Sequence, residues 1–308
     1  MKASSKATFS RRRMLAVLGA TVLGIAGLSG CASNTATPSA ALTVDVYNPK
    51  ETAIFPASSS IISGPSEAIL IDAQFQKNDA QKLVDMLQAG GKTLKAVYIS
   101  HGDPDYYFGL DVIRANFPEV KVYASPTTHA YIAASMKPKL AYWGPILKDN
   151  APSELILPEQ LPGDTLTVDG QEIKVIGLNG NDPKHTFVWV PSAKTVTGGV
   201  IVYENQHVWM ADNQTEESRQ KWLQTLENIK ALQPKTVVPG HYLATPRLNT
   251  RSVDFTRDYV LNFEAQAKQA KDAADLRERM IRLYPDFPQD VGLDISTKVR
   301  MGEMQWPQ

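Results

Sequence analysis

Histidine is the residue type in this sequence whose positions most suggest chemistry. The chain has five histidines, and three of them stand where an apolar stretch meets a loop. His101 follows the apolar residues 96–99, His185 comes directly before residues 186–190, and His241 follows another short apolar run. Neutral imidazole nitrogens are ligands that Zn²⁺ and similar divalent ions accept. The three side chains could therefore form one site if the fold brings the ends of these stretches together.

Carboxylates accompany the first of these histidines. Asp103 and Asp105 follow His101 closely in the chain, and carboxylate oxygens are also accepted by divalent ions. The two remaining histidines suggest less. His129 falls in a helical stretch and is interpreted as an ordinary surface or packing residue, and His207 begins an apolar stretch and is interpreted as structural.

The elements that must position these residues follow from the periodicity of the apolar side chains. Alternating or continuous apolar stretches predict strands, and spacing at three and four residues predicts helices. Strands are expected at 42–47, 61–72 (a hairpin turning at 64–67), 95–100, 121–124, 172–176, 186–190, 195–203, 207–210 and 236–238. Helices are expected at 78–88, 106–116, 126–150 (irregular around Trp143), 216–232 and 253–283. This order fits two mixed sheets packed face to face with helices outside.

Five landmarks in this order resemble the metallo-β-lactamase superfamily. They are Leu70-Ile71-Asp72, the segment Ser100-His101-Gly102-Asp103-Pro104-Asp105-Tyr106 with Gly109, His185-Thr186, Gly198-Gly199 and Pro239-Gly240-His241. The resemblance implies an α/β fold of the α+β kind, a four-layer αβ/βα sandwich, over residues 42–308. The family motif is His-x-His-x-Asp-His. His101 and Asp105 match it, but Asp103 and Tyr106 stand where the family has histidine. Gly199 stands where the family has an aspartate that bridges two metals.

The resemblance also implies a ligand set. His101, Asp103 and His185 correspond to one family metal site, and two histidines with one carboxylate are an accepted set for catalytic zinc. Asp105 and His241 are what remains of the second site. One Zn²⁺ or other divalent ion is therefore expected. The alternative that the site holds no metal stays open.

Catalytic roles can be assigned to the residues that the first metal does not need. Asp105 could orient water or act as a general base, and His241 could protonate the leaving group. Tyr106 or Tyr107 could donate a hydrogen bond to a developing oxyanion. Asp212 could replace the missing bridging carboxylate, but capping of the following helix is the preferred interpretation. Asp182, near His185, is interpreted as a residue of a loop turn.

The resemblance implies a metal-dependent hydrolase that acts on a small molecule with an ester, amide or thioester bond. The rival hypothesis is a non-catalytic ligand-binding lipoprotein that reuses the fold, since fold alone does not fix function. Gly199 favours the rival, and the retention of His101, His185 and His241 together opposes it. A nucleic-acid partner is not expected, because 32 basic residues balance 32 acidic ones.

The N-terminus predicts export and lipid anchoring. Arg11-Arg12-Arg13 precedes the apolar run 15–28, which is shorter than the roughly 20 residues of a membrane-spanning helix. Leu28-Ser29-Gly30-Cys31 resembles a lipobox, so residues 1–30 are expected to be a signal peptide and Cys31, the sole cysteine, to carry lipid. Export by the Sec or the twin-arginine route stays open. Residues 31–41 predict a flexible tether. A periplasm-facing anchor is expected, in the outer rather than the inner membrane because Ala32 follows the cysteine.

Overall fold

The computed structural model describes residues 40–306. The predicted signal peptide 1–30, Cys31 and all of the predicted tether except residues 40 and 41 lie outside these residues, so export and lipidation stay predictions. Within residues 40–306, no helix combines the length and the apolar character needed to cross a membrane.

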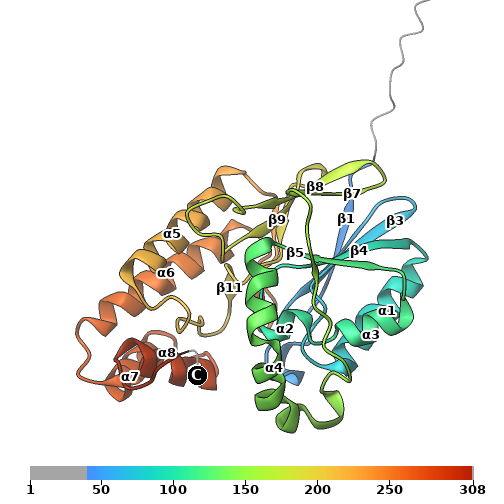
Figure 1. Ribbon diagram of the computed structural model, residues 1–308. Coiled ribbons are helices and arrows are strands. Elements are labelled where there is room, and N and C mark those ends of the chain that lie inside the picture. The colour runs from blue at the N-terminus through green and yellow to red at the C-terminus, as the bar shows by residue number, and fades with distance from the viewer. Residues whose placement is uncertain (1–39, 307–308) are drawn as a thin grey trace, which may run out of the picture. The chain divides into compact units, whose positions relative to one another are not determined.

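The first sheet follows the order of the chain (Figure 1). Its strands are β1 (Thr43–Tyr47), β2 (Ser59–Ser63), β3 (Glu67–Ile71), β4 (Thr93–Ile99), β5 (Lys121–Ala124) and β6 (Glu159–Gln160). β1, β2 and β3 pair antiparallel, which confirms the predicted hairpin, and β3 to β6 pair in parallel. Because parallel strands end at the same edge of a sheet, Asp72 after β3 and Ser100 after β4 come to lie side by side.

The second sheet runs in the order β12-β10-β9-β8-β7. These strands are β7 (Thr165–Val168), β8 (Gln171–Ile176), β9 (Phe187–Val190), β10 (Thr195–Thr197) and β12 (Thr236–Val237). Asp169 and Gly170, both at positive φ, connect β7 and β8, as a two-residue hairpin turn requires. A separate parallel pair joins β11 (Tyr203–Glu204) to β13 (His241–Tyr242). This pair brings His241 next to the segment that follows Gly199.

The helices lie outside the two sheets (Figure 1). They are α1 (Lys77–Gly90), α2 (Pro104–Tyr107), α3 (Leu110–Asn116), α4 (Pro126–Leu147), α5 (Glu216–Ala231), α6 (Thr250–Ala267), α7 (Ala273–Leu283) and α8 (Val291–Arg300). Short 3-10 turns occur at Lys50–Thr52, Lys148–Asn150 and Pro191–Ala193.

Three apolar clusters explain why these layers stay together. Between the sheets, Ile69 and Tyr98 of the first pack with Ile173 and Val188 of the second. The outer face of the first sheet packs against α1 and α3, and a third cluster joins the second sheet region to α5, α6, α7 and α8. Burial of apolar area at about 25 cal/mol per Å² makes each interface stabilising. The expected sandwich of sheets between helices is thereby confirmed.

Several predicted elements differ in the structure. The single helix expected at 253–283 is two helices, α6 and α7, separated at residues 268–272, and the helix expected at 106–116 is divided into α2 and α3 around Gly109. The strand expected at 207–210 is a loop. The strand expected at 195–203 ends at Thr197, because Gly198 and Gly199 have φ of 70° and 82°, which are left-handed conformations that a strand does not accommodate.

Helix α4 is more regular than the sequence predicted. Irregular structure was expected around Trp143, yet the helix continues from Pro126 to Leu147 through Pro138 and Pro145. A proline inside a helix costs roughly 3 kcal/mol, so other contacts must offset it. Buried Ile132 and Met136 of α4 supply such contacts in the cluster over the first sheet.

Candidate active site

The loop that carries His101 begins at a buried hydrogen-bond network. Asp72 accepts from the backbone amide of Ser100 at 2.8 Å and from its hydroxyl at 2.7 Å. The same hydroxyl oxygen accepts from the amide of Gly199 at 2.7 Å. Burial raises the pKa of Asp72 to about 8, although the bonds from Ser100 oppose that rise. The network therefore ties the end of β3, the end of β4 and the two-glycine turn into one rigid edge.

His101, Gly102 and Asp103 turn directly after this edge. The amide of Asp103 donates to Nδ1 of His101 at 3.3 Å, and a carboxylate oxygen of Asp103 lies 3.5 Å from the same nitrogen. Burial lowers the pKa of His101, more than the nearby carboxylates raise it. The imidazole is therefore neutral near pH 7, which is the form that binds metals.

Helix α4 adds a cation to this loop that sequence reasoning missed. Nζ of Lys139 lies 2.7 Å from Oδ1 of Asp103 and donates to the carbonyl of Gly102 at 3.1 Å. Burial disfavours charge on Asp103, but the Lys139 ammonium and then His101 hold its pKa below the ordinary value. Tyr131, two helical turns before Lys139, packs so closely on Gly102 that an added Cβ would lie 2.1 Å from its ring. Nothing local in the sequence indicates a contact between residues 36 positions apart.

Asp105 and His241 form a second buried pair. Nε2 of His241 lies 3.2 Å from Oδ2 of Asp105, and each side chain is 9% exposed. The ring of Tyr106 lies between the two histidines, with its centroid 5.4 Å from that of His101 and 5.7 Å from that of His241. Its hydroxyl is buried and has no hydrogen-bond partner among residues 40–306. Burial first, and the charge of Asp105 second, raise the pKa of Tyr106, so the hydroxyl is a proton donor at neutral pH.

Gly240 is required for this arrangement. A Cβ at this position would lie 2.2 Å from the carbonyl oxygen of Gly199 and 3.1 Å from the hydroxyl of Tyr106. The Pro-Gly-His sequence therefore lets the chain pass close to the two-glycine turn immediately before His241. The ring of Tyr203 then stacks on His241 at 5.2 Å.

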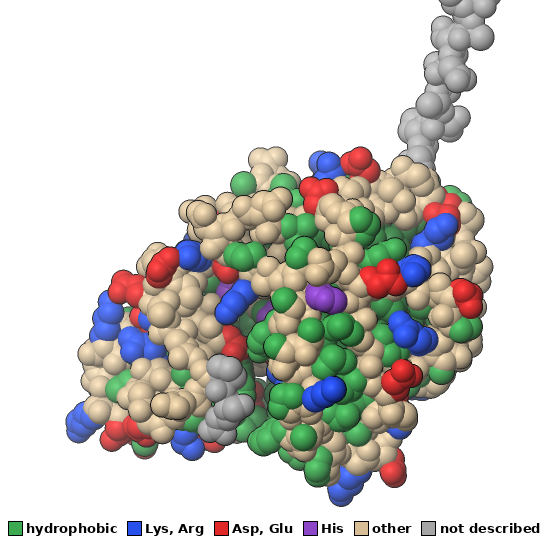
Figure 2. Space-filling model, in the orientation of Figure 1, with side chains coloured by type: hydrophobic (Ala, Val, Ile, Leu, Met, Phe, Trp, Pro, Cys, Tyr) green, Lys and Arg blue, Asp and Glu red, His purple; other side chains and the backbone are tan. Residues whose placement is uncertain are grey.

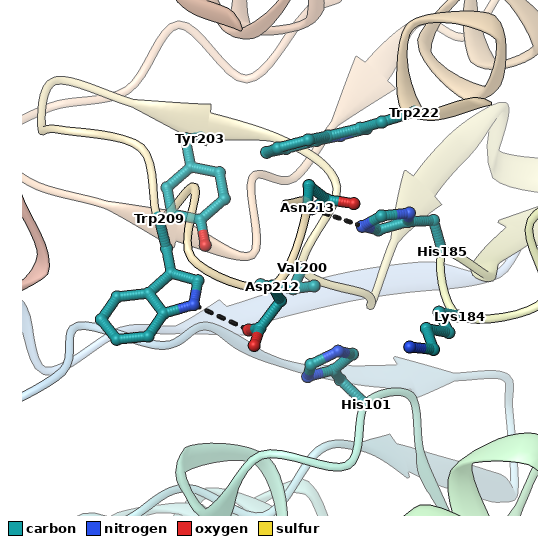
Figure 3. A pocket seen from close by; sticks show the side chains of 9 residues that line it. All are labelled: His101, Lys184, His185, Val200, Tyr203, Trp209, Asp212, Asn213 and Trp222. Atoms are coloured by element: carbon teal, nitrogen blue, oxygen red, sulfur yellow. Dashed lines mark hydrogen bonds between the residues drawn. The ribbon is translucent and has the colours of Figure 1, made fainter. Parts of the chain in front are cut away.

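His185 is held by a carboxylate and an aromatic ring. Its Nδ1 lies 2.6 Å from Oδ2 of Asp182, and its ring stacks on Trp222 at 5.3 Å. The other ring nitrogen, Nε2, lies 3.4 Å from the side-chain nitrogen Nδ2 of Asn213 (Figure 3). A carboxylate on one ring nitrogen fixes the ring and leaves the other nitrogen for a ligand, as is common behind metal-binding histidines. Asp182 therefore forms the loop turn that the sequence predicted and, in addition, orients the ring of His185.

His101 and His185 line the same small pocket, which has a volume of about 30 Å³ (Figure 3). Figure 2 shows the surface hollowed between the parts that α4 and α5 occupy in Figure 1, with small patches of histidine at the upper edge of the hollow. The remaining lining residues are Lys184, Val200, Tyr203, Trp209, Asp212, Asn213 and Trp222. Of the other predicted site residues, none lines it: Asp103, Asp105, Tyr106 and His241 all lie outside its lining. Tyr203, which does line it, stacks on His241.

The interpretation of Asp212 as a helix cap is wrong. The N-cap of α5 is Thr215, whose side chain accepts from the amide of Ser218. Asp212 instead faces the pocket, and its carboxylate accepts from the indole nitrogens of Trp209 at 2.7 Å and Trp306 at 2.8 Å. Asp212 is therefore a candidate functional residue, because two tryptophans hold its carboxylate on the wall of the histidine pocket. The sequence had favoured helix capping over this role.

The two other histidines do not line the pocket and contact other parts of the fold. Nδ1 of His129 lies 2.7 Å from the carbonyl oxygen of Pro158. His207 is buried, with Nδ1 2.9 Å from the hydroxyl of Tyr259 and its ring among aromatic neighbours.

A comparison with models of known protein families shows the family to which this chain belongs. The model of the metallo-beta-lactamase superfamily matches residues 53–241, which include every landmark from Asp72 to His241. The chain belongs to the metallo-beta-lactamase superfamily.

Solved structures of metallo-beta-lactamases share the fold. A metallo-beta-lactamase from Pontibacter korlensis is 18% identical, with a TM-score of 0.53 over 72% of this chain and 99% of that one. A metallo-beta-lactamase family protein from Thermus thermophilus is 17% identical, with a TM-score of 0.57 over 83% of this chain and 91% of that one. A comparison with curated proteins gives no significant match.

Metallo-beta-lactamase superfamily members usually bind divalent metals such as zinc, so the site can be tested for its fit to such an ion. His101 and His185 face one pocket, and Asp182 at Nδ1 of His185 leaves Nε2 of that ring for a ligand. Nδ1 of His101 instead accepts from the amide of Asp103, so His101 would have to move its proton from Nε2 to Nδ1 to bind an ion through Nε2. Across residues 40–306, however, no group of three His, Cys, Asp or Glu side chains stands ready around one point. Asp103 pairs with Lys139 and Asp105 with His241. The pocket therefore presents two imidazoles to a cation, and Asp103, whose Oδ1 is held by Lys139, would have to turn towards the pocket to join them.

Proposed function

We propose that this member of the superfamily is an exported, lipid-anchored hydrolase that uses one divalent metal ion to cleave an ester, amide or thioester bond in a small molecule. The observation that carries the proposal is the shared pocket of His101 and His185. Burial lowers the pKa of His101, which favours the uncharged imidazole that metal ions bind, and Asp182 orients His185 as the supporting partner of a metal ligand does. Asp103 is the third ligand that we propose.

A second metal ion is not part of the proposal. Gly199 has no side chain to bridge two ions, and the unpartnered Tyr106 hydroxyl stands where the family has a histidine ligand. Asp105 and His241 already form a buried pair, with 3.2 Å between Oδ2 of Asp105 and Nε2 of His241. A neutral phenol with a raised pKa is a poor metal ligand but a good hydrogen-bond donor.

The residues beyond the metal ligands can handle protons. A bound divalent ion lowers the pKa of water towards 7 and polarises a carbonyl group. We assign to the Asp105–His241 pair the acceptance of the proton of the attacking water and its return to the leaving group, because Nε2 of His241 and Oδ2 of Asp105 lie 3.2 Å apart. The hydroxyl of Tyr106 is buried and does not line the pocket, so it would donate to negative charge on a substrate oxygen only after the pocket wall moves to expose it. Trp222 and Tyr203 form the apolar walls that limit access of water to the pocket.

Elemental analysis of purified protein after reconstitution with Zn²⁺ tests the metal claim. We expect about one equivalent of zinc in the wild type, and a loss of most of it in His101→Ala and His185→Ala, because each change removes a ligand. His129→Ala is the matched control, since His129 lies on α4 and contacts Pro158. Full zinc retention in both pocket variants, or a wild type with less than a tenth of an equivalent, contradicts the proposal.

The anchor is tested separately. We propose that Cys31 carries lipid and that the protein faces the periplasm from the outer membrane, because Ala32 rather than aspartate follows the cysteine. Wild-type protein should partition into a detergent phase and sediment with outer membranes, whereas Cys31→Ala should remain in the aqueous phase. Equal partitioning of the two proteins contradicts lipidation.

A further inference from the structure

Lys139 is the best-coordinated cation in the site. An ammonium group has three donors, and here each has an acceptor: Oδ1 of Asp103 at 2.7 Å, the carbonyl of Gly102 at 3.1 Å and the hydroxyl of Tyr131 at 3.3 Å. The ammonium also lies 4.3 Å from the centroid of the Tyr131 ring. A cation with every donor engaged and an aromatic ring beside it is held in place, unlike an ordinary surface lysine.

The pair with Asp103 is also shielded from water. The side chains of Lys139 and Asp103 are 19% and 25% exposed, whereas the ion pair of Lys121 with Glu159 on the outer surface has values of 60% and 57%. Screening by solvent makes exposed ion pairs weak, and the shielded pair is correspondingly stronger. Releasing Asp103 from Lys139 therefore costs free energy.

Under the proposed function, a bound divalent ion and Lys139 would both draw on the carboxylate of Asp103. It is the third ligand under the proposed function, on which this inference rests. We propose that Lys139 is a positioning residue that withholds Asp103 from the divalent ion and so lowers the metal affinity of the site. In this arrangement the lysine supplies the positive charge that Asp103 needs when no metal is bound, and keeps the loop His101–Asp103 folded.

Two alternative roles of Lys139 lead to different expectations. If Lys139 acted only by repelling the ion at a distance, removal of another positive charge at the pocket should have the same effect. Lys184 provides that comparison, because it lines the pocket and no ion pair with Asp103 is found for it among the described residues. If Lys139 were purely structural, its loss would lower stability without raising metal affinity. Lys137 is a matched control for helix α4, since it is exposed and lies two residues away.

The experiment is a titration of metal-free, full-length protein with Co²⁺, followed by its visible absorption, and with Zn²⁺ in competition with a chromophoric chelator. The variants are Lys139→Met, Lys139→Arg, Lys184→Met and Lys137→Met, with circular dichroism to verify folding. Lys139→Met should bind both ions at least about tenfold more tightly than the wild type. It should also show an altered Co²⁺ spectrum, because a carboxylate joins the two imidazoles.

The other variants complete the test. Lys139→Arg should resemble the wild type, because arginine keeps the ion pair, and Lys137→Met should do the same. Lys184→Met should gain less affinity than Lys139→Met. Equal affinities in the wild type and Lys139→Met overturn the inference while leaving the single-metal hydrolase intact. An equal gain in Lys184→Met and Lys139→Met also overturns it. Metal binding by Lys139→Met but not by the wild type supports the inference and contradicts the proposed function.

Discussion

Oδ2 of Asp182 lies 2.6 Å from Nδ1 of His185, three residues along the same loop. With this contact on one side and the Trp222 ring stacked on its face, the imidazole is held in one orientation. A partner on the far ring nitrogen raises the basicity of a histidine ligand and fixes its tautomer. The pocket therefore depends on a carboxylate that does not line it.

Asp182→Asn should weaken zinc binding without loss of fold. The amide keeps the size of the carboxylate but not its charge, and loss of such a supporting partner typically costs about tenfold to 100-fold in metal affinity. Competition with a chromophoric chelator measures the change. Asp286→Asn is the control, because Asp286 is exposed in the loop before α8. An unchanged affinity in Asp182→Asn shows that the contact does not support a metal ligand.

Tyr106→Phe should separate activity from stability. The hydroxyl of Tyr106 is buried and has no partner in the fold, so its removal leaves no group unsatisfied and should not lower the melting temperature. If this hydroxyl stabilises charge on the substrate, kcat should fall by about 100-fold.

Tyr107→Phe is the matched control for that change. The hydroxyl of Tyr107 is also buried without a partner, but the ring of Tyr107 is not between His101 and His241. Its kcat should stay within about threefold of the wild type, a change too small to represent the loss of an oxyanion donor. A loss of rate in Tyr107→Phe with none in Tyr106→Phe would contradict the assignment of the donor to Tyr106.

Stability should decrease in acid because of His207. Burial, with a smaller effect of Arg277, lowers the pKa of His207 to about 4 in the folded protein, whereas an unfolded histidine titrates near 6.5. The unfolded chain therefore binds a proton first, and stability that is present above pH 6.5 is lost as the pH falls towards 4. The loss amounts to about 3 kcal/mol for this group.

Urea denaturation between pH 7 and pH 4 measures that loss. In His207→Gln the decrease should be smaller by about the same amount, because glutamine can still accept from Tyr259 and does not titrate. His129→Gln should retain the wild-type decrease. The same acid sensitivity in His207→Gln and the wild type attributes the effect to other groups.

Ser100→Ala should destabilise the site edge. The Ser100 hydroxyl links the carboxylate of Asp72 to the buried amide of Gly199, so alanine leaves that amide without its acceptor. A buried polar group left unsatisfied costs about 1–3 kcal/mol, which urea denaturation can detect. Thr167→Ala, an exposed change on β7, should cost less than about 0.5 kcal/mol. A similar small effect in both variants contradicts the importance of this network.

The sequence predicted the elements whose signal is local. The hairpin of β2 and β3 and the strand before His101 are short apolar runs with clear turns or ends, so their side-chain pattern is sufficient. The histidine landmarks were found from their places at the ends of apolar stretches: His101 follows β4, His185 lies just before β9 and His241 begins β13. Family membership over residues 53–241 accords with that reasoning.

Other features depend on contacts between distant residues and could not be predicted locally. Helix α4 continues through two prolines because it packs on the first sheet, and this continuation brings Lys139 to Asp103. Asp212 stands three residues before an N-cap, which suggested capping, but its two tryptophan donors come from positions 209 and 306. In each case tertiary packing outweighs the local preference.

A crystal of the wild-type protein soaked in Zn²⁺, with diffraction recorded on both sides of the zinc absorption edge, tests the central claim most directly. We predict one anomalous peak per chain, within the pocket that His101 and His185 both line. Two peaks, a peak only at Asp105 and His241, or no peak in that pocket contradicts a single-metal site built on the two imidazoles.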